Sequence, residues 1–219
     1  MTGPFRAGAH YALGGDPWAI VHDAVFAGLN HALSNRVMGM EGVIAIGQRR
    51  GAVDWPSILA EQERSTQLLQ LYRLLEAVPD ERAEPMHVSE PVADATSLLR
   101  HHLALRDVII GSEIAPENAV VTLPRRSAVR AFLVLLHEAA RRAERGGGGV
   151  LWRYEVGAGD VTVMATTRPG VDADADAVLV QRAAQFVGRP APDAWCVLDP
   201  GRSYIAALRL PLVAARHRS

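Results

Sequence analysis

The chain has 219 residues, of which 49% are apolar, and a formal net charge of −1. This length and composition allow a buried core in one or two domains. The balanced charge gives no broad basic surface for nucleic acid or an anionic membrane. Cys196 is the one cysteine, which excludes an internal disulfide. Because neither a signal-peptide pattern nor an apolar run of about 18 residues is present, we expect a soluble, cytoplasmic protein.

A long helix is predicted to begin at Asp16 and Pro17, because aspartate caps helices and proline fits the first helical position. Apolar residues then follow at the spacing of one helical face: Phe26, Leu29, Leu33, Val37, Met40 and Ile44. His31 and Asn35, one turn apart, fall on roughly the opposite side of the helix.

A turn over residues 48–54 leads into a second helix, which Asp54 caps and which repeats the helical spacing at Leu68, Leu71, Leu75 and Val78. So short a connection makes the two helices antiparallel. Because a two-helix hairpin cannot bury both of its faces alone, we expect a homodimer in which two hairpins form a four-helix bundle. A proline-bounded acidic segment, 79–85, is predicted to link this hairpin (residues 1–80) to a second domain (86–219).

The second domain mixes short strands with helices. Residues 88–91 are expected to be extended, and helices are predicted at 92–106, 127–145 and 175–187. Strands are predicted at 107–110, 119–123, 150–156, 160–166, 194–198 and 203–212. This order predicts an α+β fold in which an α/β sandwich carries its helices on one face of a sheet.

The order of elements, together with several short motifs, resembles the catalytic core of sensor histidine kinases. The segment 31–37 (His-Ala-Leu-Ser-Asn-Arg-Val) is similar to that family's H-box, in which the phosphorylated histidine is followed four residues later by Asn or Thr. Residues 133–143 resemble its N-box helix, 161–171 the strand that leads into its first glycine box, and 199–211 its closing hairpin. The resemblance implies a dimerisation hairpin followed by a sandwich of the histidine-kinase ATPase type.

The positions that would hold nucleotide depart from the family pattern. The magnesium-orienting asparagine corresponds to Glu138, the adenine-binding aspartate to Thr166, and the first glycine to Arg168, whereas Gly170 is retained. Exchanging a carboxylate acceptor for a hydroxyl weakens a hydrogen bond, and Arg168 adds bulk where backbone must approach the ligand. We therefore expect a degenerate ATP-binding domain with no ATP and no resident metal.

The resemblance then implies a histidine phosphotransferase. Ala32 stands where many kinases have an acidic base after the histidine, which disfavours attack on ATP. Transfer between a histidine and a receiver-domain aspartate demands less, because the receiver brings its own magnesium. In this interpretation His31 carries the phosphoryl group, Asn35 hydrogen-bonds near it, and Arg36 offsets its charge. The partners are a response-regulator receiver and a hybrid or sensor histidine kinase.

Two alternatives stay open. The chain is a non-enzymatic scaffold that docks a response regulator or kinase, or it is an active kinase that uses Glu138 for magnesium and Thr166 for adenine. His22, which an aspartate follows, is a rival phosphoacceptor. The pairs 101–102 (His-His) and 141–142 (Arg-Arg) are interpreted as solvated helix surface.

Overall fold

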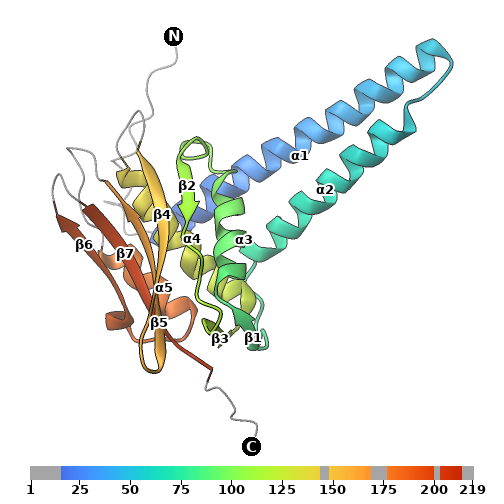
Figure 1. Ribbon diagram of the computed structural model, residues 1–219. Coiled ribbons are helices and arrows are strands. Elements are labelled where there is room, and N and C mark those ends of the chain that lie inside the picture. The colour runs from blue at the N-terminus through green and yellow to red at the C-terminus, as the bar shows by residue number, and fades with distance from the viewer. Residues whose placement is uncertain (1–15, 144–147, 169–176, 200–202, 214–219) are drawn as a thin grey trace, which may run out of the picture.

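The computed structural model describes residues 16–143, 148–168, 177–199 and 203–213, and it begins with the expected helical hairpin (Figure 1). Helix α1 spans Pro17–Arg50 and α2 spans Trp55–Leu75. The Asp16 side chain accepts a hydrogen bond from the Trp18 amide, and Asp54 accepts one from the Ser57 amide, so both predicted N-caps are confirmed. Gly51 ends α1 with a φ of 73°, a left-handed conformation that glycine adopts without strain.

The rest of the chain is an α/β sandwich. Strands β2 (Ile109–Ser112), β4 (Gly149–Val156), β5 (Asp160–Thr167), β7 (Ser203–Pro211) and β6 (Ala194–Asp199) form one sheet in that order, with β2 parallel to β4 and the other pairs antiparallel. Strands β1 (Glu84–His87) and β3 (Val120–Leu123) form a separate antiparallel pair. Helices α3 (Ser89–Leu99), α4 (Arg125–Arg142) and α5 (Ala177–Phe186) lie on one side of the larger sheet (Figure 1). The predicted fold class is confirmed.

Several predicted boundaries are wrong. Part of the predicted linker is strand β1, and the segment 88–91 that we expected to be extended mostly belongs to α3. Pro91 lies in the first turn of α3, where a proline removes no intrahelical hydrogen bond. Helix α3 also ends at Leu99, well before residue 106, in a series of tight turns.

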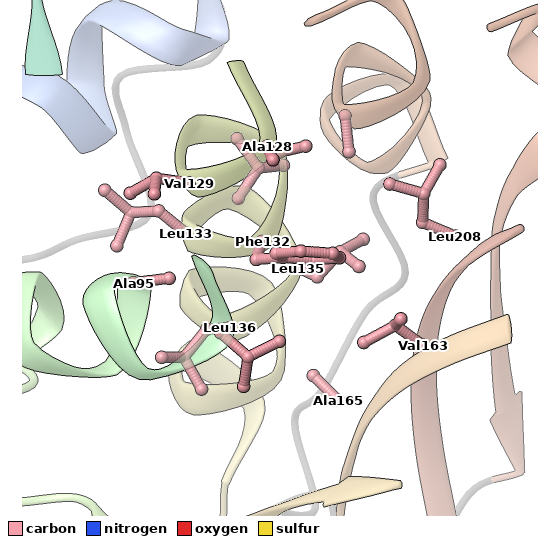
Figure 2. Close-up of a cluster of buried hydrophobic side chains, with 14 of the residues drawn as sticks. Ala95, Ala128, Val129, Phe132, Leu133, Leu135, Leu136, Val163, Ala165 and Leu208 are labelled. Atoms are coloured by element: carbon pink, nitrogen blue, oxygen red, sulfur yellow. The ribbon is translucent and has the colours of Figure 1, made fainter. Parts of the chain in front are cut away.

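Helix α4 lies at the centre of the core. It is apolar on most sides, which is typical of a helix covered all round. Figure 2 shows its side chains between α3 and the sheet, with these labelled residues buried: Ala95, Ala128, Val129, Phe132, Leu133, Leu135, Leu136, Val163, Ala165 and Leu208.

The amino-terminal half of α1 is part of this same core. Val21, Val25 and Leu29 are at most 2% exposed and belong to one cluster with α4 and the sheet. The Trp18 ring also packs edge-on against Phe186 of α5. Beyond Leu29 the hairpin projects away from the sandwich (Figure 1). None of the helices in the described ranges has the length and apolar character needed to cross a bilayer.

Candidate functional site

His31 is exposed on α1, two residues after Leu29, which is buried in the core. Its Nε2 lies 3.2 Å from Nδ2 of Asn35, one helical turn further on. An amide NH₂ only donates, so Nε2 accepts this hydrogen bond and the ring proton lies on Nδ1. The structure therefore brings the predicted pair together, with the Nε2 lone pair engaged by the Asn35 amide.

Arg36 lies on the side of α1 that faces α2. Its Nη1 is 3.0 Å from Oε2 of Glu61, and Glu61 also accepts from Arg64, with Nη1 to Oε1 at 2.6 Å. These ion pairs hold the two helices of the hairpin together. The structure thus ties Arg36 to α2 instead of placing it beside the His31 ring, and its proposed role near a phosphoryl group stays a prediction.

His22 has a different setting. Its ring stacks on Phe26 with the centroids 5.4 Å apart, and its Nδ1 lies 2.9 Å from the Asp23 carboxylate. Because the ring is partly buried against its own helix, it offers less access to a partner than His31 does.

Glu138 is fully buried on α4 and forms an ion pair with Arg142 one turn later. The Arg142 guanidinium also lies over the Tyr204 ring, 4.6 Å from its centroid. Burial alone would raise the pKa of Glu138, but the neighbouring His137 and the charges of Arg142 and Arg141 hold that pKa below its ordinary value. The expectation that Arg142 lies on a solvated face is wrong, because this side of α4 is covered by the sheet.

A second buried pair lies beside this one. The rings of His102 and His137 are 5.3 Å apart, and both side chains are buried. Burial, together with the neighbouring His137, lowers the pKa of His102 to about 4, so its ring is neutral at pH 7. The expectation that His102 is a surface residue is also wrong. The sequence did contain a signal for this burial. His102 follows the buried Leu98 and Leu99 by about one helical turn, and the chain keeps turning after α3, so His102 lies on the same inner side.

The other nucleotide positions do not converge on Glu138. Because side chains alternate along a strand, and Val163 and Ala165 of β5 point toward α4, Thr166 lies on the opposite face of the sheet. Its Oγ1 donates to the Leu151 carbonyl at 3.0 Å. Arg168 is exposed just after β5, and Gly170 lies outside the described residues.

Within the described ranges, no cluster of three or more histidine, cysteine, aspartate or glutamate side chains is arranged to hold a metal ion.

Comparison with known proteins gives similarity of structure only. No protein-family model matches the chain, and no curated protein matches it in sequence. Among solved structures, a histidine kinase from Burkholderia phymatum STM815 is 12% identical, with 91% of this chain and 100% of that one covered and a TM-score of 0.46. Full-length ShkA in complex with AMPPNP is 15% identical (85% and 46% covered, TM-score 0.49). The histidine kinase ThkA in complex with the response regulator TrrA is 12% identical (86% and 61% covered, TM-score 0.46).

The first and the third of these structures are histidine kinases. The likeness concerns the arrangement of helices and strands.

Proposed function

We propose that the chain is a histidine phosphotransferase that relays a phosphoryl group between receiver-domain aspartates. The observation that carries the proposal is the exposed His31 ring, with Nε2 kept as the unprotonated nitrogen by Asn35. In the transfer step the Asn35 amide releases Nε2, the Nε2 lone pair attacks phosphorus, the bond between phosphorus and the aspartyl oxygen breaks, and the carboxylate leaves. Nδ1 keeps its proton throughout, and the reverse step passes the group to a second aspartate.

Two features support a protein donor over ATP. Ala32 follows His31, so no carboxylate stands next to the histidine in sequence to act as its base. Glu138, the residue at the magnesium position, is fully buried and already paired with Arg142. A magnesium ion there would have to compete with a buried ion pair, which is costly to break.

We further propose that a second copy of the chain covers one side of the hairpin. Arg36 and Glu61 mark the sides on which α1 and α2 face each other. At about 100° per residue, Val37 and Ile44 of α1 and Leu69 of α2 fall on one flank of the hairpin. Their side chains are 37–47% exposed in the single chain, and pairing two hairpins would bury them. His31 and Asn35 lie on the other flank and stay accessible.

The dimer is tested by light scattering coupled to size-exclusion chromatography. Val37→Asp is expected to convert a dimer of the wild type into a monomer, because a charge would be buried between the hairpins. Met38→Asp is the matched control, since Met38 is 60% exposed on the same helix but points away from that flank. A wild-type monomer, or equal effects of the two changes, contradicts the proposed interface.

The transfer activity is tested with two phosphoryl donors. The purified chain is incubated with labelled Mg-ATP or with phosphoramidate, a small donor that phosphorylates histidine directly, and is then mixed with purified receiver domains from the same genome. We expect no label from ATP, label from phosphoramidate, and transfer to one or a few receivers. His31→Ala should abolish transfer to the receivers while His22→Ala retains it. Label from ATP that requires His31 would instead identify an active kinase.

A non-enzymatic scaffold is the second candidate. It is favoured by the hydrogen bond from Asn35, which satisfies Nε2 as it would in an ordinary surface histidine. In that case His31→Ala leaves the binding of a receiver or kinase unchanged, and no receiver accepts phosphoryl from the phosphoramidate-treated chain.

A further inference from the structure

Gly28 marks an unusually close approach between α1 and the sandwich. A Cβ atom at this position would overlap the His101 carbonyl oxygen and lie 2.7 Å from the carbonyl carbon. Two other glycines of the same helix, Gly39 and Gly42, have no neighbouring atom within 4 Å of such a Cβ. Glycine is therefore required at 28 by backbone contact, whereas at 39 and 42 there is room for a side chain.

The connection between α3 and β2, which carries His101, is held in place by backbone hydrogen bonds. The amides of His101 and His102 donate to the carbonyls of Leu98 and Leu99 at 3.0 and 2.8 Å, and the Arg106 amide donates to the His102 carbonyl at 2.9 Å. The His102 ring is itself buried against His137 of α4. Consecutive turns anchored in the core leave the His101 carbonyl little freedom to retreat.

Helix α1 is equally constrained on its side. Val25 and Leu29, which flank Gly28, are buried in the core shared with α4 and the sheet. A side chain at 28 would push α1 outward and pull these two residues from their contacts. Since the helix is continuous to Arg50, a displacement at Gly28 tilts the whole projecting hairpin.

His31 lies three residues beyond this contact, about 4.5 Å further along the helix and on a neighbouring part of its surface. A folded partner that covers His31 therefore also meets the connection between α3 and β2, where the Leu103 side chain is 51% exposed.

We propose that Gly28 is a positioning residue: its contact with the His101 backbone is a rigid joint that fixes the angle between hairpin and sandwich. The joint presents His31 and the α3–β2 connection to a receiver domain as one surface. The joint itself is a statement about conformation, whereas its effect on transfer rests on the proposed phosphotransferase function.

The conformation is tested by distances between spin labels on exposed residues, at Gln48 near the hairpin tip and Glu155 on β4, in a Cys196→Ala background. Dilution with unlabelled chain restricts the signal to pairs within one chain. We expect one narrow distance in the wild type and in Gly42→Ala, and a shifted or broadened one in Gly28→Ala. A broad distribution of distances in the wild type, or the same distances in Gly28→Ala and Gly42→Ala, shows that the contact at Gly28 does not fix the angle and overturns the proposal. The wild-type distribution decides even if Gly28→Ala does not fold.

The effect on transfer is tested with the same variants. In Gly28→Ala, phosphoramidate should label His31 at the wild-type rate, because this small donor needs only the ring. The KM for the receiver should rise, and kcat/KM should fall by up to about 100-fold, the scale expected when reacting groups are misplaced by about 1 Å. Gly42→Ala should leave both values unchanged.

A Gly28→Ala variant in which labelling and transfer fall equally would show general structural damage and overturn the positioning role. If the wild type transfers to no receiver, the proposed function fails, and the spin-label distances still decide whether the joint exists.

Discussion

Replacing Glu138 by glutamine should destabilise the protein strongly, although the change removes only a charge. Glu138 is 0% exposed and the Arg142 side chain is 1% exposed, so neither can turn to solvent when its partner is lost. Removing one partner of a buried ion pair costs about 3–5 kcal/mol. Arg142 keeps its 3.0 Å hydrogen bond to the Glu138 carbonyl and its contact with Tyr204, which places the loss near the lower end.

A loss of about 3 kcal/mol corresponds to a decrease in Tm of about 6–12 °C for a chain of this size. It is measured by urea and thermal unfolding of Glu138→Gln beside the wild type. The control is the double variant Glu138→Leu with Arg142→Met, which replaces the ion pair by apolar side chains of similar size. It should lose less stability than Glu138→Gln, because replacing both members of a buried ion pair by apolar side chains is less costly than removing one of them.

A Glu138→Gln variant within about 0.5 kcal/mol of the wild type would refute this reasoning, because surface substitutions have effects of that size. It would mean that Arg142 does not depend on Glu138 for its counter-charge.

Three further changes test other parts of the structure. Gly42→Ala should raise the free energy of unfolding by about 0.5–1 kcal/mol, because alanine fits the open position and favours helix. A lower Tm in thermal unfolding would instead show that the added methyl group meets a neighbouring atom. Thr96→Val should lower the free energy of unfolding by about 1–3 kcal/mol, because Trp152 is buried and its Nε1 donates to Thr96 Oγ1 at 3.1 Å. An unchanged midpoint of urea unfolding would argue against that hydrogen bond. His102, whose pKa is lowered to about 4 in the folded state, takes up its proton first in the unfolded state, so it contributes stability above pH 6.5 that is lost as the pH falls toward 4. The loss should reach about 3 kcal/mol at about 1.4 kcal/mol per pKa unit. His102→Asn should make the free energy of unfolding depend less on pH. If the pH profiles of the variant and the wild type run parallel, the buried neutral ring is contradicted.

Features that depend on local sequence were predictable. Asp16 and Asp54 cap the helices as expected, and His31 and Asn35 meet because residues four apart lie on one helical face. Leu29 is buried as the helical spacing predicts, whereas Val37 and Ile44 on the same stripe are exposed in the single chain. The spacing identifies an apolar face but does not identify what covers it.

Features that depend on tertiary packing were missed. The face of the sheet on which Thr166 lies is set by the pairing register of β5, in which a shift of one residue reverses every side chain, so the sequence does not give it. Arg142 was interpreted as solvated, although an acid four residues before an arginine also signals an ion pair on one helix face. The contact of Gly28 with His101 joins segments distant in the chain, and no local pattern predicts it.

The burial of α1 in the main core also has a consequence for biosynthesis. Asp16 at the start of α1 bonds to Arg182 of α5 at 2.9 Å, across a separation of 166 residues. At a translation rate of about 5–20 residues per second, the first turns of α1 wait roughly 10–30 s for that partner to emerge from the ribosome. During this interval Trp18, Val21 and Val25 have no completed core to enter, so the nascent hairpin presents an apolar segment suited to chaperone binding.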